Sequence, residues 1–212
     1  MLEPSPHLLI PDFLGRTMVE RLIAHCAENE SHFVPTAVGD GQSAKHDYGL
    51  RRSSTLAHAD DFSRELHELF KARLAGLLPS IVAALGLSPF VPTAYEMELT
   101  AHNDGAFFGK HIDTFTGRVD LPVQRMVTAV YYFFAQPRRF SGGALRLFPL
   151  LDASETSRFV DVEPVNDGLI CFPSFAPHAV QPIACPSGAF ADSRFAINNW
   201  ICRAPPSPRQ AN

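Results

Sequence analysis

The sequence has few charged residues and lacks a long apolar run or a block of basic residues. Charged side chains make up 19% of its 212 residues and hydrophobic ones 46%, which excludes a disordered chain. Acidic residues outnumber basic ones by 22 to 18 and the net charge is −4, so we expect no nucleic-acid partner. No apolar run approaches the roughly 20 residues of a membrane span, and we expect no membrane partner.

The cysteines are few and scattered. Cys26, Cys171, Cys185 and Cys202 form no C-x-x-C pair, and residues 1–6 lack the basic and apolar regions of a signal peptide. These features predict reduced thiols and a cytoplasmic location.

The first part of the chain has helical apolar spacing, which indicates segments that pack one face on a core. The predicted helices are Arg16–Glu28, which Asp12 or Gly15 would cap, a segment from Asp60 and Asp61 to Pro79, and Ser80–Leu85, which Gly86 would end. Residues 38–49 are polar and carry glycine, so they are expected to form a surface loop.

From Phe90 onward, short β-branched and aromatic runs alternate with turn signals. The predicted strands are Ala94–Ala101, Phe107–Asp113, Met126–Phe134, Ala144–Phe148, Phe159–Val162, Leu169–Phe172, Ala179–Ile183 and Phe195–Cys202. Such a series of short strands predicts a sandwich or jelly roll.

One pair of polar side chains has metal-ligand spacing. His111 and Asp113 stand two apart in a predicted strand, so both point to the same face. His178 follows Pro177 at the start of a later strand, which in a closed double sheet could approach the same spot from across the core. Two imidazoles and one carboxylate on one face of a metal are typical of non-haem Fe(II) oxygenases. Alone, His-x-Asp is also compatible with a surface histidine beside a solvated carboxylate.

Arg194 opens the last predicted strand, with Ala196, Asn198 and Trp200 on its face. If the opposite face packs on the apolar shell, the guanidinium points into the barrel and needs an anion there. A dicarboxylate co-substrate that reaches the metal at its other end would satisfy it. The alternative is a solvent-exposed Arg194 paired with Asp192.

Several short motifs occur in the order found in one known family. They are His111-Ile112-Asp113, Val130-Tyr131-Tyr132, Ser141–Pro149, Val162-Glu163-Pro164, Pro177–Pro182 and Arg194–Ile197. The stretch from Tyr95 to Ile201 thus resembles the prolyl-hydroxylase branch of the Fe(II)/2-oxoglutarate-dependent dioxygenases, which includes the oxygen-sensing prolyl hydroxylase domains and bacterial relatives.

This resemblance implies an α+β, mainly β fold. Its core would be a double-stranded β-helix (jelly roll) with N-terminal helices packed on one sheet. We expect a single oxygenase domain over residues 1–203, with a helical support region over about 1–90 and the catalytic core over about 91–203. Residues 204–212 are expected to fray.

The resemblance also implies roles for particular residues. His111, Asp113 and His178 are similar to the iron ligands, and Arg194 to the anchor for the distal carboxylate of 2-oxoglutarate. Tyr132 is similar to the tyrosine that assists this anchor.

Four further residues and a segment are weaker candidates. Thr128 shares the strand face of Tyr132 and is grouped with the co-substrate site. His102 stands near a tyrosine of many relatives, so it contacts co-substrate or substrate, or only sits in a turn. Trp200 matches a pocket-wall tryptophan, although a lone tryptophan also suits an ordinary core. Arg51 and Arg52 belong to a segment, Lys45–Thr55, that is a rim or lid over the metal or a solvated loop.

The implied reaction uses Fe(II), 2-oxoglutarate and O2, with ascorbate as a possible stimulant, and yields succinate and CO2 while an unactivated C–H bond is hydroxylated. A prolyl residue of a protein or peptide is the expected substrate. The alternatives are a free amino acid or small metabolite, a non-catalytic metal or 2-oxoglutarate sensor on the same barrel, and a cupin-type enzyme with another metal.

Overall fold

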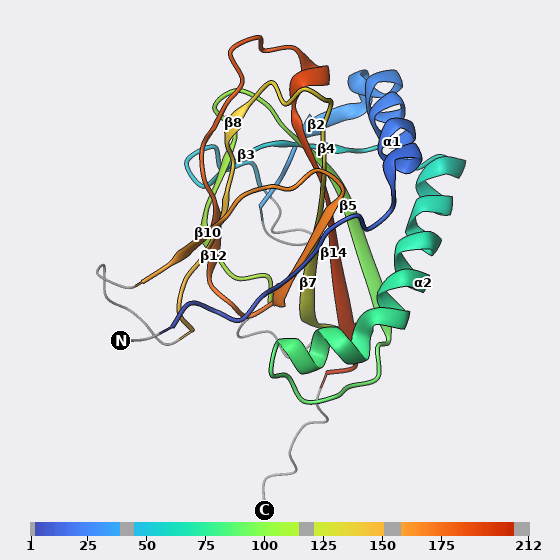
Figure 1. Cartoon of the computed structure of the whole chain (residues 1–212), viewed down its shortest axis with the longest axis vertical. Helices are drawn as coiled ribbons and strands as arrows, with labels where there is room; N and C mark the ends of the chain where they lie inside the picture. The colour runs from blue at the N-terminus through green and yellow to red at the C-terminus, as the bar shows by residue number, and fades with distance from the viewer. Residues whose placement is uncertain (1–2, 39–44, 115–120, 151–157, 206–212) are drawn as a thin grey trace, which may run out of the picture.

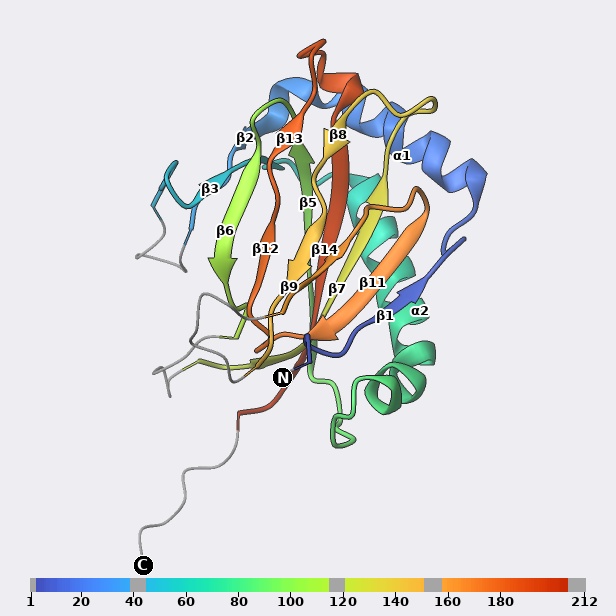
Figure 2. The ribbon, with the colours of Figure 1, turned by 60° about the vertical axis from the view of Figure 1, so that its left-hand side comes forward.

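The computed structural model describes residues 3–38, 45–114, 121–150 and 158–205. Its larger sheet has the order β1 (Leu8–Ile10), β11 (Gly168–Pro173), β7 (Gln124–Phe133), β14 (Arg194–Arg203), β5 (Ala94–His102), β4 (Ser54–Leu56) and β2 (Phe33–Pro35). Its smaller sheet has the order β10 (Val160–Val162), β9 (Leu145–Leu147), β12 (His178–Val180), β6 (Phe107–His111) and β3 (Arg51–Arg52), and β13 (Ile183–Ala184) pairs with β8 (Ser141–Gly142). The two main sheets face each other (Figure 2). The predicted mainly β jelly roll is confirmed.

The helices pack on the outside of the larger sheet (Figure 1). Helix α1 spans Arg16–Glu28, as predicted, and Gly15 caps it. Helix α2 spans Asp61–Ala84 and begins at the side-chain cap Asp60. The prediction of a separate third helix was wrong, because α2 continues through Pro79. Leu78, Ile81 and Val82 extend its buried stripe, and their packing outweighs the loss of the hydrogen bond that proline cannot donate. Gly86, with φ 65°, follows its end.

Several strand boundaries differ from the sequence-based expectation. Strand β6 ends at His111, so Asp113 lies beyond it, and the predicted strand Ala179–Ile183 is divided between β12 and β13. The structure adds short strands that the pattern did not predict, namely β1, β2, β3, β4 and β8. They are two or three residues long, too short to show an alternation. Strands β1, β3 and β4 pair with longer neighbours, whereas β2 pairs with β4 and β8 with β13.

The central strand β7 separates two packing layers. Its side chains Tyr131 and Phe133 join the outer cluster under the helices, and Val130 and Tyr132 join the inner cluster between the sheets. The outer layer is therefore apolar, and the inner layer can hold polar groups. The four cysteines are unpaired, in agreement with the predicted reduced thiols, and all four are buried.

Asp167 joins the chain's first segment to this sheet. It adopts a left-handed backbone conformation with φ 59°. Its carboxylate accepts hydrogen bonds of 2.8 Å each from the backbone N–H groups of Leu14 and Gly15 and from the hydroxyl of Tyr131. The entry to α1 is thus fixed on β7.

The expected frayed segment 204–212 lies mostly outside the described residues, as does half of the predicted 38–49 loop. Among the described residues, no helix combines the length and the apolar character that crossing a bilayer would require.

The α2 packing gives a stability prediction. Leu74 is fully buried against the larger sheet, so Leu74→Ala should lower the free energy of unfolding by about 2–5 kcal/mol. Lys71→Ala on the exposed side of the same helix should change it by less than about 0.5 kcal/mol. Urea unfolding followed by circular dichroism measures both, and equal losses would contradict the observed orientation of α2.

Candidate metal centre

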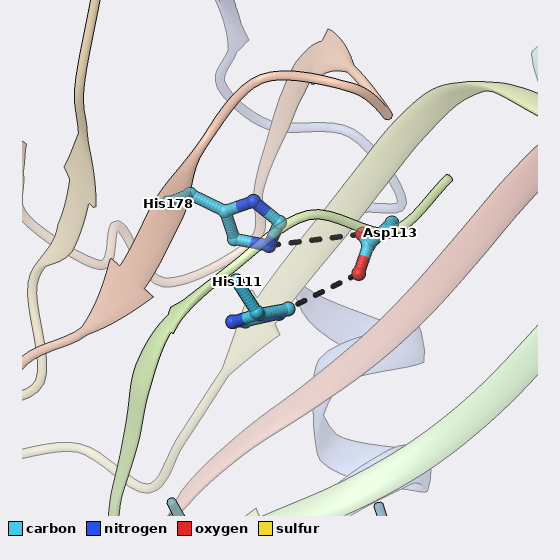
Figure 3. A group of neighbouring side chains, drawn as sticks. All are labelled: His111, Asp113 and His178. Carbon is cyan, nitrogen blue, oxygen red and sulfur yellow. Dashed lines mark ion pairs between the residues drawn. The ribbon is translucent and has the colours of Figure 1, made fainter. Parts of the chain in front are cut away.

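Neighbouring strands bring two histidines and an aspartate together. Strand β12 pairs with β6 so that His178 lies opposite His111, and Asp113 follows two residues after β6 ends. The Nε2 atom of His111 lies 3.5 Å from Oδ1 of Asp113, and that of His178 lies 3.7 Å from Oδ2 (Figure 3). One ligand atom from each residue lies within 4.8 Å of the others. His178 thus approaches from the adjacent strand of the same sheet, so the expectation that it comes from across the core was wrong.

Backbone carbonyls orient both imidazoles. Nδ1 of His111 lies 2.8 Å from the carbonyl oxygen of Gly109, and Nδ1 of His178 lies 2.9 Å from that of Ala176. Because a carbonyl oxygen only accepts, each Nδ1 carries the proton and each Nε2 keeps its lone pair. Both lone pairs therefore belong to the nitrogens nearest the carboxylate, as a shared metal requires.

The protonation states suit a cation. Burial lowers the pKa of His178 to about 4, so its imidazole is neutral near pH 7. Burial alone would raise the pKa of Asp113, but His178, His111 and the Trp200 hydrogen bond hold it below its ordinary value. One carboxylate and two imidazoles form the donor set of the facial triads that hold non-haem Fe(II).

Two side chains of the larger sheet hold Asp113. The hydroxyl of Thr128 and the indole N–H of Trp200 donate to its Oδ2 atom at 2.7 and 2.9 Å. The sequence groups Thr128 with the co-substrate site. In the structure its hydroxyl contacts the Asp113 carboxylate and lies 3.0 Å from Oγ of Ser174. Trp200 lines the cavity as predicted, and its contact with Asp113 was not foreseen.

The cluster lies in a cavity of about 480 Å³ between the sheets. Its lining includes the predicted residues His102, Thr128, Tyr132, Arg194, Trp200 and Arg51 together with His111, Asp113 and His178. Arg52 is exposed and is not part of this lining; its guanidinium lies beside Gly105 instead. The alternation along β3 explains this, because adjacent strand residues point to opposite faces.

Arg194 is buried in the cavity with 1% of its surface exposed. Its Nη1 donates to the carbonyl oxygen of Gly143 at 2.9 Å, its guanidinium carbon lies 5.0 Å from the Tyr132 ring centroid, and its Nε has no hydrogen-bond partner. Burial lowers its pKa, yet a guanidinium stays charged at neutral pH. A buried, incompletely paired cation matches a carboxylate ligand, and the alternative of a surface pair with Asp192 was wrong.

His102 lies beside this guanidinium. It is the register partner of Arg194 on β5, is buried, and its Nδ1 has no partner. Burial first, then the positive charges of Arg194 and Arg51, hold its pKa well below the ordinary value, so the ring is neutral. A neutral imidazole can offer a hydrogen bond to an anion at Arg194, which suits the predicted co-substrate end of the cavity.

Sequence reasoning missed two charged cavity residues, Glu98 and Arg125, and gave no role to Asn198, although it placed Asn198 on the strand face of Arg194. Glu98 binds Nη2 of Arg51 at 3.1 Å and accepts a 3.3 Å hydrogen bond from Asn198. Counting by two along the strand from His102 reaches Glu98, so strand alternation could have found it. Arg125 carried no such signal.

The chain belongs to the 2OG-Fe(II) oxygenase superfamily, a class of oxidoreductase enzymes. The sequence profile of that superfamily matches residues 97–202, half of the chain. This region contains the candidate metal ligands His111, Asp113 and His178, and it also contains Tyr132, Arg194 and Trp200. The match confirms the resemblance drawn from the short motifs.

Particular relatives agree with this assignment. An uncharacterised PKHD-type hydroxylase of Synechocystis is 38% identical over 140 residues, which is 64% of this chain and 45% of that protein, so the chain spans less than half of its length. The fold is similar to a Pseudomonas putida prolyl-4-hydroxylase (TM-score 0.63, 23% identity, 94% and 93% of the two chains). It is also similar to a Trichoplax adhaerens prolyl hydroxylase in complex with a hypoxia-inducible-factor peptide (TM-score 0.66, 21% identity, 93% and 83%).

The cluster predicts a metal-binding phenotype. Asp113→Ala removes the charged ligand from a pocket rather than from the apolar core, so it should abolish Mn²⁺ or Fe²⁺ binding and leave the fold largely intact. Isothermal titration with Mn²⁺ measures the binding, and circular dichroism serves as the control for folding. Retained Mn²⁺ affinity in this variant would contradict the assigned ligand set.

Proposed function

We propose that this chain is an Fe(II)- and 2-oxoglutarate-dependent dioxygenase that hydroxylates an unactivated C–H bond, with a prolyl residue of a protein or peptide as the leading substrate. The observation that carries the proposal is the placement of Arg194 in the same cavity as His111, Asp113 and His178. A site that only holds a metal needs no buried guanidinium, whereas a dicarboxylate bound to both would satisfy the metal and the arginine.

Each group of cavity residues has its own role in the proposed reaction. Bound iron and 2-oxoglutarate supply the oxidative chemistry, in which O2 is consumed, succinate and CO2 form and one oxygen atom enters the C–H bond. His111, Asp113 and His178 would hold the iron, and Arg194, Tyr132 and His102 would bind the distal carboxylate. Apolar side chains of the inner cluster, among them Val130 and Leu145, keep water from the same space.

The substrate assignment draws on two of the relatives, whose names describe prolyl hydroxylases. The second candidate, a free amino acid or small metabolite, is favoured by a feature of the cavity: Arg51 and Glu98 form a largely buried ion pair in its wall. Such a pair offers both charges to a small polar substrate. A non-catalytic sensor on the same barrel stays a third candidate.

Three further statements complete the proposal. The support region and core, residues 1–203, form one oxygenase domain, because helices and strands share one apolar cluster. Ascorbate stimulates turnover by keeping the iron reduced. The protein is cytoplasmic, which suits four unpaired buried thiols.

Activity is tested by turnover of the co-substrate. With Fe(II), ascorbate and 2-oxoglutarate, the protein should form succinate, and the rate should rise when proline-containing peptides or, for the second candidate, free amino acids are added. Mass spectrometry should then find one added oxygen on the substrate that stimulates. Asp113→Ala is the matched inactive control. Absence of both succinate and 2-oxoglutarate binding would overturn the proposal, and binding without succinate would favour the sensor.

The anchor role of Arg194 has its own test. Arg194→Ala should weaken 2-oxoglutarate binding by about 2–5 kcal/mol, since it removes the cation of a buried charged contact. Titration calorimetry in the presence of Mn²⁺ measures this loss, and unchanged Mn²⁺ affinity shows that the metal cluster is intact. Wild-type affinity for 2-oxoglutarate in the variant would remove Arg194 from the site.

A further inference from the structure

The carboxylate of Asp113 is held asymmetrically. Its Oδ2 atom accepts two hydrogen bonds, from the Thr128 hydroxyl at 2.7 Å and from the Trp200 indole N–H at 2.9 Å. Each oxygen also faces one imidazole, Oδ1 that of His111 at 3.5 Å and Oδ2 that of His178 at 3.7 Å, but Oδ1 accepts neither of these two hydrogen bonds. The two oxygens of this buried group therefore have different surroundings.

Both donors come from one position in the larger sheet. Thr128 on β7 and Trp200 on β14 are direct register partners, and both side chains point inward. The guanidinium of Arg125 covers the indole, with its carbon 3.9 Å from the ring centroid. Packing on one face and the hydrogen bond at its edge thus fix the plane of the indole.

The backbone holds Asp113 from the other side. Its N–H donates to the carbonyl oxygen of Ser174 at 2.8 Å, and Oγ of the same serine lies 3.0 Å from the Thr128 hydroxyl. The carboxylate follows the end of β6, so these contacts replace the strand pairing that it lacks. Its orientation is set before any ligand binds.

We propose that the cross-strand pair of Thr128 and Trp200 positions Asp113 for metal binding, holding Oδ2 so that Oδ1 alone is offered to the metal. Two donors on Oδ2 engage its lone pairs, and single-atom ligation leaves more coordination positions for other ligands. The proposal rests on the proposed iron site, and it gives Thr128 and Trp200 a role as positioning residues that neither the family assignment nor the cavity lining supplies.

The pair also provides a signal that is independent of turnover. Trp200 is the one tryptophan of the chain, so tryptophan emission comes from it alone. Since its N–H is bonded to the carboxylate that would bind the metal, Mn²⁺ should quench this emission with the same midpoint as binding. Hydroxyl loss at position 128 should shift that midpoint.

The experiment compares Mn²⁺ binding by wild type, Thr128→Val and Thr128→Ser. The near-isosteric valine removes the hydroxyl and should weaken Mn²⁺ binding about 10–100-fold, as loss of an outer-sphere partner does. Serine keeps the hydroxyl and should restore most of the affinity. Free Mn²⁺ measured by electron paramagnetic resonance gives the dissociation constant, and Trp200 emission gives a second reading.

Thr100→Val is the matched control. Thr100 is also fully buried in the larger sheet, but its hydroxyl donates to the carbonyl oxygen of Ala196 and does not touch the cluster. It should bind Mn²⁺ as wild type does. Trp200→Phe, which keeps an aromatic ring and removes the N–H, should lose affinity like Thr128→Val in the paramagnetic resonance measurement, and it decides the matter if the valine variant does not fold.

The outcomes separate this inference from the proposed function. Wild-type affinity in both Thr128→Val and Trp200→Phe, equal losses in Thr128→Ser and Thr128→Val, or an equal loss in Thr100→Val would overturn the positioning role while leaving the iron site in place. Failure of the wild type to bind Mn²⁺ or Fe²⁺ at all would overturn the proposed function itself.

Discussion

The alternation of side chains along β7 and β14 is the constraint on which the site depends. Tyr131 and Tyr132 are adjacent in sequence, yet the first packs under the helices and the second lines the cavity. The same two strands direct Thr128, Trp200 and Arg194 inward. A shift of one residue in either strand would place these polar groups against the apolar helices and would leave the cavity without its buried arginine.

Burial gives the polar groups of the cavity their chemical properties. The side chains of Arg194 and Asp113 have little exposure to solvent. An unpaired charge in such surroundings is costly. Asp113 offsets that cost through two donors and two neighbouring imidazoles. Arg194 has one carbonyl partner and an Nε atom without a partner, so the cost of burying its charge is offset only in part. The end of the cavity near Arg194 is therefore the place where a bound anion stabilises the protein most.

The sequence predicted the elements whose patterns are long. Helix α1 follows a clear apolar stripe, and the long strands β5, β7 and β14 have enough residues to show their alternation. Spacing combined with the order of the family motifs selected His111, Asp113 and His178, which the structure brings together. Strands of two or three residues carry no such pattern, and continuation of α2 through Pro79 depended on tertiary packing that a local rule for proline cannot include.

Contacts between side chains could not be predicted from the sequence in the same way. That Thr128 donates to Asp113, and that Arg52 turns away from the cavity while Arg51 enters it, depends on register and on a two-residue strand. Asp167 shows how far such dependence reaches, because its carboxylate binds backbone groups 153 and 152 positions earlier. During synthesis, the contact that fixes the entry to α1 on β7 can thus form only after residue 167 has left the ribosome.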